Sequence, residues 1–229
     1  KVMALAEKTG APLVALCDSQ GALLDEGMAA VNAYASIMAK SADLSGVIPQ
    51  ITLVLGPCGG GAAMCASMAD VVIMSKNGQL FVNGPLVVSA ATGHNVKMED
   101  IAGAKAAVKS GAAHIAAESD EDAIAQARKL VAMLPGNNLD DAPYAFESQD
   151  DVNRELTELN AIDTVADVKD VIARAADNAE VVELGDEYAP EMVTALARRG
   201  GSVDGFVGTQ GAKNDGRLTV EGCKKAARF

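Results

Sequence analysis

The stretch LGPCGGGAAMCASMADVVIM, residues 55–74, contains three consecutive glycines, Gly59, Gly60 and Gly61, followed by small residues and a short apolar run. A glycine in a regular element costs roughly 0.5–1 kcal/mol relative to alanine, so some feature of the fold must require bare backbone there. An apolar strand pattern precedes the glycines, a small-residue helix pattern follows them, and residues 70–75 read as another buried strand. This order of strand, turn, helix and strand predicts an α/β layer fold.

The same alternation extends to both sides of this stretch. Further strands are predicted over residues 11–19, 48–56 and 79–84, and helices over residues 1–10, 25–42, 59–68 and 118–134. A polar segment containing Pro135 and Gly136 then reads as a linker. Beyond it, the patterns predict a helix over 167–177, a strand over 179–185, a helix over 188–201 and a strand over 202–210. We therefore expect one α/β unit and the start of a second.

Composition narrows the class of protein. Apolar residues make up 49% of the 229 residues and aromatic residues only 3%, so aliphatic side chains must build the core. The 19 basic and 31 acidic residues give a net charge of −12, which argues against nucleic acid as a partner. No apolar run reaches the roughly 20 residues of a membrane span, and no secretory signal opens the chain. The first residue, Lys1, lies within a helical pattern, so we expect a piece of a longer protein.

The cysteines carry no metal-binding or redox motif. Cys17, Cys58, Cys65 and Cys223 form no C-x-x-C pair, so no metal ligands are predicted. Free, buried thiols suit a reducing compartment, and the expected localisation is therefore cytoplasmic.

A glycine turn between a strand and a helix presents free backbone N–H groups, which suit a phosphate or an oxyanion that develops on a carbonyl. No Lys follows the glycines as a P-loop requires, and the dinucleotide pattern G-x-G-x-x-G finds no third glycine. No Ser stands in a G-x-S-x-G arrangement either. An oxyanion hole is the best remaining chemical interpretation, and tight packing of a small-residue helix on the sheet is the structural alternative.

Several stretches carry a resemblance that covers nearly the whole chain in order. They are KTGAPLVALCDSQGALLDEG (residues 8–27), SGVIPQITLVLGPC (45–58), the glycine stretch, and GRLTVEGCKKAARF (216–229). Together they resemble the biotin-dependent acyl-CoA carboxyltransferases. These are the carboxyltransferase β subunits of propionyl-CoA and acetyl-CoA carboxylases and the α subunits of glutaconyl-CoA and methylmalonyl-CoA decarboxylases.

This resemblance implies a crotonase-like α/β fold of repeated ββα units. Residues 1–133 would form an N-terminal carboxyltransferase domain that lacks its first part, and residues 134–178 an interdomain linker and helix. Residues 179–229 would begin a truncated C-terminal domain. The family's second oxyanion hole, which binds the biotin carbonyl, would lie beyond Phe229.

The resemblance also implies an enzyme that moves a carboxyl group between biotin and a short-chain acyl-CoA through a thioester enolate. By motif, Gly60 and Gly61 are the oxyanion hole for the thioester. The further substrate-binding residues are Gly59, Ser19, Gly21, Ala22, Gly84 and Pro85. Biotin would be the cofactor, carried on a partner protein. The expected partners are acyl-CoA, a biotinylated carrier protein, biotin carboxylase or decarboxylase subunits, and further copies in a homo-oligomer.

The chain departs from the family at two places. Leu23 stands where the family has Arg, and the stretch AGAKAAVKSG, residues 102–111, lacks the family's His. Both differences bear on the choice of acyl chain. Among the other polar residues, His114 reads as structural, His94 as a loop or ligand-contact residue, and Lys105 as part of a solvated helix face or a contact for coenzyme A phosphates.

Two other classes of function remain open. A crotonase-like acyl-CoA hydratase or isomerase would share the glycine oxyanion hole, but it needs carboxylates near the hole, and Ala, Ala, Met and Cys follow Gly61. A non-catalytic assembly subunit of a carboxylase complex would keep the fold without the reaction.

Overall fold

The computed structural model describes residues 1–145, 150–151, 153–157, 159 and 167–229. They form two compact units, Lys1–Val131 with Pro135–Asp141 and Ala132–Leu134 with Ala142–Phe229. Parts of the predicted linker, residues 146–149, 152, 158 and 160–166, lie outside the described residues, and the predicted domain limits stay a prediction. Within the described part of the chain, no helix has the length and apolar character needed to cross a membrane.

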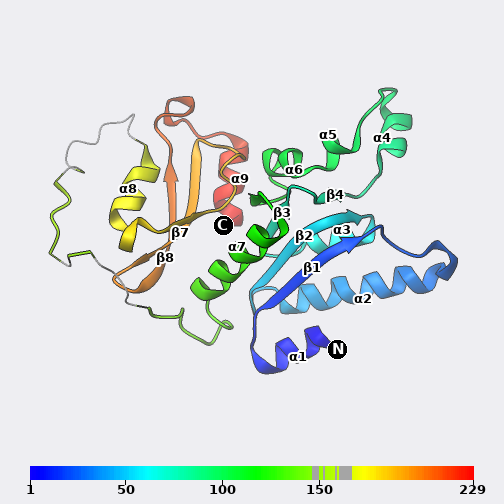
Figure 1. Cartoon of the computed structure of the whole chain (residues 1–229), viewed down its shortest axis with the longest axis horizontal. Helices are drawn as coiled ribbons and strands as arrows, with labels where there is room; N and C mark the ends of the chain where they lie inside the picture. Colours follow the sequence, from blue (N-terminus) through cyan, green and yellow to red (C-terminus); the bar gives the residue numbers. More distant parts are fainter. Residues whose placement is uncertain (146–149, 152, 158, 160–166) are drawn as a thin grey trace. The chain divides into compact units, whose positions relative to one another are not determined.

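The first unit is built on a parallel sheet (Figure 1). Its strands run in the order β1-β2-β3-β5, and β4 pairs with the end of β2. The strands are β1 (Leu13–Ser19), β2 (Gln50–Gly59), β3 (Val71–Ser75), β4 (Gln79–Phe81) and β5 (Ile115–Ala117). The predicted α/β class is confirmed.

The core of this unit lies around β2 and β3, whose side chains are apolar on both faces of the sheet. Val54, Val72 and Met74 are fully buried and share one cluster with Leu80 of β4 and Val108. Continuous apolar runs of this kind are typical of parallel strands that helices cover on both faces. Burial of those strands explains why their apolar runs were recognisable in the sequence.

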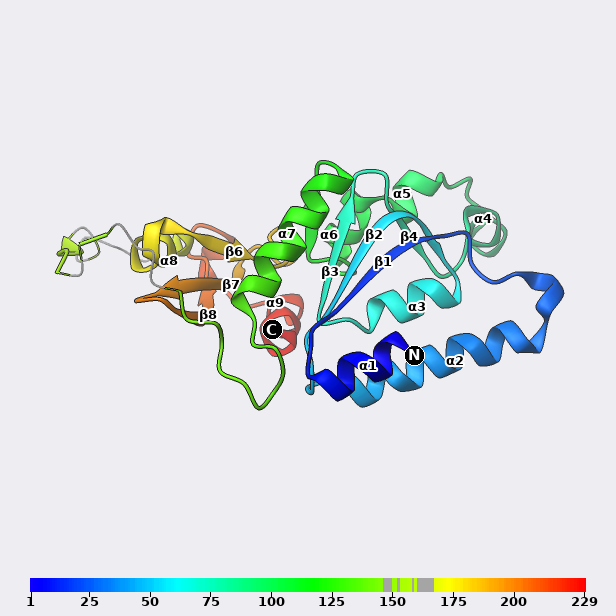
Figure 2. The same cartoon turned by 60° about the horizontal axis from the view of Figure 1, so that its bottom comes forward.

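The helices of this unit flank the sheet. They are α1 (Val2–Thr9), α2 (Met28–Leu44), α3 (Gly61–Ser67), α4 (Pro85–Thr92), α5 (Met98–Ala102), α6 (Ala104–Ser110) and α7 (Asp120–Met133). Helices α2 to α6 connect its strands, whereas α1 precedes β1 and α7 follows β5. In Figures 1 and 2, α2 and α3 lie side by side. Ser119 and Asp122 cap the start of α7, where the Ser119 hydroxyl accepts the Asp122 N–H and the Asp122 carboxylate accepts the Glu118 N–H.

The second unit contains an antiparallel sheet of order β6-β7-β8. Its elements are α8 (Val168–Ala175), β6 (Val181–Glu183), β7 (Met192–Arg199), β8 (Ser202–Thr209) and α9 (Val220–Arg228). Ile172 and Ala176 pack with Val193 and Ala197 of β7 in a core cluster of this unit. The predicted helix over 167–177 and the strands over 179–185 and 202–210 are confirmed.

The helix predicted over residues 188–201 is wrong, because Met192–Arg199 forms β7 and pairs with β8 along its whole length. Met, Ala, Leu and Arg favour a helix locally. Gly200 and Gly201 both have positive φ and close a tight turn that returns the chain as β8. Pairing with β8 therefore overrides the local helix propensity.

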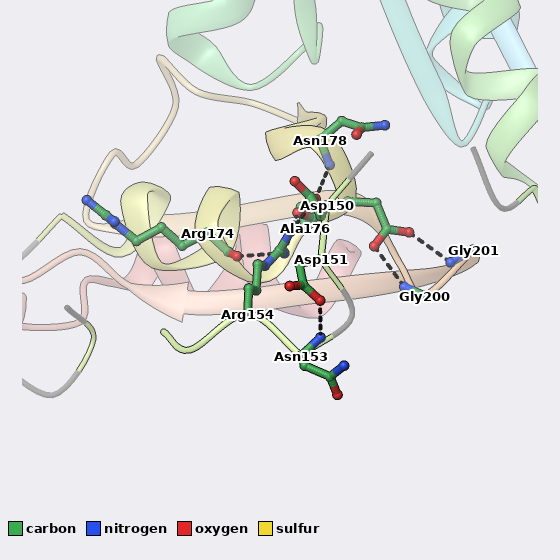
Figure 3. Close-up of polar contacts among 10 residues, drawn as sticks. Asp150, Asp151, Asn153, Arg154, Arg174, Ala176, Asn178, Gly200 and Gly201 are labelled. Atoms are coloured by element: carbon green, nitrogen blue, oxygen red, sulfur yellow. Dashed lines mark hydrogen bonds and ion pairs between the residues drawn. The ribbon is translucent and has the colours of Figure 1, made fainter. Parts of the chain in front are cut away.

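Polar contacts hold the hairpin turn to Asp177 and hold the segment around Arg154 to the end of α8 (Figure 3). The Asp177 carboxylate accepts the N–H groups of Gly200 and Gly201 at 2.9 and 2.8 Å. The Arg154 guanidinium donates to the carbonyls of Arg174 and Ala176 at 3.0 and 3.1 Å. These bonds satisfy backbone groups at the end of α8 and at the hairpin turn, where no helix or sheet partner is available.

Candidate functional site

The three glycines lie at the junction of β2 and α3, and the local geometry requires a glycine at each position. A Cβ on Gly59 would lie 2.8 Å from two atoms of the Phe81 ring. A Cβ on Gly61 would lie 2.9 Å from Cγ of Tyr34. Gly60 has open space around it, but its φ of 59° and ψ of −126° suit glycine alone. Close approach of two aromatic rings and one unusual backbone conformation thus explain the bare backbone.

The N–H groups of this turn do not all face the same way. Gly60 donates its N–H to the carbonyl of Phe81 at 2.9 Å, so this predicted oxyanion donor is engaged within the fold. Gly61 begins α3, and the carbonyl of Gly60 already accepts the N–H of Met64 at 3.2 Å. The N–H groups of Gly61 and Ala62 belong to the first turn, which has no intrahelical acceptor for them. Ala62 is thus a candidate donor that the sequence motif alone did not indicate.

The predicted residues at the end of β1 lie beside this turn. Ser19 pairs with Cys58 in the parallel ladder, one residue before the glycines. Gly21 has a φ of 109°, and a Cβ on it would lie 3.4 Å from the carbonyl oxygen of Gly59. Its N–H donates to the Ser19 hydroxyl at 3.3 Å. The structure therefore brings Ser19 and Gly21 to the glycine turn, and Ala22 follows in the same loop.

The predicted residues Gly84 and Pro85 follow β4 and start α4, with Pro85 as its first residue. The carbonyl of Gly84 accepts the N–H groups of Val87 and Val88, both at 3.1 Å. Since β4 pairs with the end of β2, Gly84 and Pro85 come three and four positions after Phe81, the ladder partner of Gly59. Their part in substrate binding stays a prediction.

Large apolar side chains are exposed on the segments that follow β1 and β4 and on α3. They are Leu23, Leu24, Met64, Val82, Leu86 and Val87. Exposed apolar side chains of this size are candidates for contact with a ligand or another protein. Leu23, which by the resemblance stands where the family has Arg, is one of these residues.

Three thiols come from the elements that meet at the glycine turn, β1, β2 and α3. Cys17 of β1 packs against the core that contains Cys58 of β2, and Cys65 belongs to α3. The Cys58 thiol donates a hydrogen bond to Cys17, which lowers the pKa of Cys17 more than burial raises it. The same bond, together with burial, raises the pKa of Cys58, and burial raises the pKa of Cys65.

The two histidines have different surroundings, and a contact of His94 with a ligand stays a prediction. Nδ1 of His114 accepts the backbone N–H of Val72 at 2.9 Å, and the backbone N–H of His114 donates to the Val72 carbonyl at 2.8 Å, which supports the predicted structural role. His94 is exposed after α4, and Lys105 is exposed on α6. In the described residues, no group of three or more His, Cys, Asp and Glu side chains is arranged to hold a metal ion.

A parallel α/β sheet with a glycine turn leading into a helix defines a class of protein that binds its ligand at the ends of parallel strands. Comparison with known proteins places the chain within one family. Residues 1–229 match the carboxyl transferase domain family, and the chain belongs to it.

Named relatives of this family are similar to the chain over its whole length. The methylmalonyl-CoA decarboxylase subunit alpha of Veillonella parvula is 41% identical, with 100% of this chain and 46% of the relative covered. The propionyl-CoA carboxylase beta chain of Saccharopolyspora erythraea is 37% identical, with 100% and 44% covered. The chain therefore spans a little less than half the length of these relatives.

A solved structure agrees closely with the fold. The transcarboxylase 12S structure described as a hexamer, with methylmalonyl-coenzyme A and methylmalonic acid bound, matches with a TM-score of 0.95 at 35% identity. That match covers 99% of this chain and 44% of the other. The likeness confirms the predicted crotonase-like α/β fold.

Proposed function

We propose that this chain is the acyl-CoA-binding part of a biotin-dependent carboxyltransferase, which moves a carboxyl group between biotin and a short-chain acyl-CoA. Membership of the carboxyl transferase family over all 229 residues carries this proposal. The names of its relatives support short-chain substrates, since they act on methylmalonyl-CoA and propionyl-CoA. The transcarboxylase 12S structure with methylmalonyl-coenzyme A bound supports the same class of ligand.

The chemistry assigned to the glycine turn is the stabilisation of negative charge on the substrate. Removal of a proton next to the thioester carbonyl places negative charge on the thioester oxygen. The N–H groups of Gly61 and Ala62, at the first turn of α3, would donate to that oxygen. One such donor typically contributes about 2.7–4 kcal/mol to the transition state. Gly60 would join them only by giving up its bond to the Phe81 carbonyl.

The partners follow from the same reaction. Biotin, carried on a separate carrier protein, would supply or accept the carboxyl group, and biotin carboxylase or decarboxylase subunits would complete the cycle. The residues described above serve the thioester side. A homo-oligomer in the cytoplasm is the proposed state, and two observations support the oligomer. These are the exposed apolar side chains around the turn and the hexamer named for transcarboxylase 12S.

Carboxyl transfer to or from methylmalonyl-CoA by the full-length protein, with a biotinylated carrier, tests the class of reaction. Transfer supports the proposal. Hydration of an enoyl-CoA without carboxyl transfer would favour the hydratase alternative. Binding of a CoA ester without either reaction would favour an assembly subunit.

To test whether the Gly61 N–H is an oxyanion donor, a variant must remove this N–H without adding a new clash. Tyr34→Ala clears the space that a Cβ at Gly61 requires, and proline is tolerated at the first position of a helix. Gly61→Pro in the Tyr34→Ala background should lower turnover by about 10²–10³-fold relative to Gly61→Ala in the same background. Both variants carry a Cβ, but only the proline lacks the N–H. Equal turnover in two folded variants would remove Gly61 from the oxyanion hole.

A further inference from the structure

The dipeptide Asn-Gly occurs twice in the sequence, and its two copies lie in different backbone surroundings. Asn77-Gly78 stands between β3 and β4, and Asn83-Gly84 stands between β4 and α4. Asparagine before glycine is prone to lose its side-chain amide, because glycine has no side chain to hinder attack by its nitrogen on the asparagine side chain. Both asparagine residues are exposed. Exposure therefore does not distinguish the two places, and any difference in reactivity must come from the backbone.

The backbone of the first copy is held in place around Gly78. The N–H of Gly78 donates to the carbonyl of Ser75 at 2.9 Å, and the N–H of Asn77 donates to the Ser75 hydroxyl at 3.3 Å. A Cβ on Gly78 would lie 2.4 Å from the carbonyl oxygen of Val54, so this residue is closely surrounded by other backbone. The Gly78 nitrogen can attack the Asn77 side chain only after it leaves its hydrogen bond, which requires local opening of the segment.

The backbone of the second copy has no such restraint around Gly84. Within the described part of the chain, neither the Gly84 N–H nor the Asn83 side-chain amide has a hydrogen-bond partner. A Cβ on Gly84 would meet no atom within 4 Å, and the φ of −69° at this residue is an ordinary one. The two reacting groups belong to adjacent residues, so the Gly84 nitrogen can approach the Asn83 side chain without the opening of a folded element.

We propose that Asn83 is a site of spontaneous deamidation. The Gly84 nitrogen, after losing its proton to hydroxide, attacks the side-chain carbonyl carbon of Asn83 and closes a succinimide ring. The bond from that carbon to the amide nitrogen breaks, and ammonia leaves with a proton from water. Water then opens the ring at either carbonyl and gives aspartate or isoaspartate. In sum, one amide and one water become one carboxylate and one ammonium ion, and nothing is oxidised or reduced.

The modified residue follows the strand that supports the glycine turn. Asn83 comes two residues after Phe81, whose carbonyl accepts the Gly60 N–H and whose ring lies against Gly59. Either product adds a negative charge there, and isoaspartate also lengthens the backbone by one carbon atom. Deamidation is therefore expected to alter the segment beside the candidate thioester site, although the proposal itself does not depend on the carboxyltransferase activity.

The test is incubation of the folded full-length protein at mildly alkaline pH, followed by digestion and mass spectrometry. Each deamidation raises the mass by about 1 Da, because a hydroxyl replaces an amino group. Cleavage after Phe81 separates Asn77 from Asn83, because Phe81 lies between them. The mass gain should appear at Asn83 at least about tenfold faster than at Asn77, because only Asn77 requires local opening. In urea, where both segments are open, the two rates should become similar.

Matched variants decide between the outcomes. Gly84→Ala adds a side chain where space and φ allow one, so the fold should be kept while the mass gain at Asn83 slows several-fold. Asn77→Gln should leave the rate at Asn83 unchanged. An equal or faster gain at Asn77 in the folded protein, no gain at Asn83, or an unchanged rate in Gly84→Ala would each overturn the proposal. These readouts need no enzymatic activity, so failure of the proposed function would leave the test intact.

Discussion

Alanine substitution at Gly61 and at Gly60 should destabilise the first unit for different physical reasons, and Tyr34 distinguishes the two. A Cβ at Gly61 would lie 2.9, 3.0 and 3.2 Å from Cγ, Cδ2 and Cδ1 of Tyr34. Non-bonded carbon atoms prefer about 3.5–4.0 Å, so the ring or α3 must move by about half an ångström or more. Nothing lies within 4 Å of a Cβ at Gly60, but its φ of 59° is unfavourable for alanine.

The magnitudes follow from these two causes. Overpacking of this kind costs about 1–3 kcal/mol, and the lower entropy of alanine in the unfolded chain returns about 0.4–1 kcal/mol. Gly61→Ala should thus lower the free energy of unfolding by about 1–2 kcal/mol. Gly60→Ala should lower it by about 1–3 kcal/mol through backbone strain.

The double variants with Tyr34→Ala test whether the two costs have these two causes. In a Tyr34→Ala background the clash at Gly61 disappears, so Gly61→Ala should cost little there, and the coupling energy should be about 1–2 kcal/mol. Gly60→Ala should cost the same in both backgrounds, within about 0.5 kcal/mol.

Amide hydrogen exchange in β2 and β3 measures the opening of the first unit separately from the second, which is necessary because the chain has two units. Equal costs of Gly61→Ala with and without the Tyr34 ring would refute the packing argument. A strong dependence of Gly60→Ala on Tyr34 would refute the backbone argument.

Two further predictions concern the second unit. Asp177→Ala removes the acceptor of the Gly200 and Gly201 N–H groups and should destabilise the β7–β8 hairpin by about 1.5–3 kcal/mol, seen as faster amide exchange there. Burial lowers the pKa of Lys225 from its ordinary value of 10.5, so the folded chain binds this proton less tightly than the unfolded chain. Stability should therefore rise as pH rises through the folded-state pKa toward 10.5, and Lys225→Met should flatten that rise in the urea midpoint.

The sequence was sufficient to predict the elements whose pattern is local. β2 and β3 are buried on both faces, so their apolar runs are continuous and bounded by turn residues. α7 begins with an acidic first turn and a capping box, which is also a local signal.

β7 shows what a local pattern misses. Its composition favours a helix, and its true partner, β8, follows the turn at Gly200 and Gly201. Two glycines followed by the β-branched and aromatic residues of 202–209 were the available hairpin signal. Because that turn was interpreted as the end of a helix, residues 188–201 were predicted as a helix and not as a strand.

The candidate site was predicted in its location but not in its contacts. The glycine motif placed the turn at the end of β2, where the structure has it. Tyr34 and Phe81 come from distant parts of the sequence, and no local pattern connects them with the glycines. For the same reason, the bond from the Gly60 N–H to the Phe81 carbonyl was not predictable, although it changes which N–H groups are open.

These contacts change how the glycine run should be interpreted. Gly59 and Gly61 are explained by the rings of Phe81 and Tyr34, and Gly60 by its backbone conformation, without any reference to a ligand. Loss of activity on replacing any of them by a larger residue would therefore follow from disturbed packing or strain as readily as from a lost oxyanion donor. Only removal of an N–H in a background where the added side chain fits separates the two. For that reason the Gly61→Pro and Gly61→Ala pair in the Tyr34→Ala background, rather than a substitution at one glycine, decides whether this turn is chemical as well as structural.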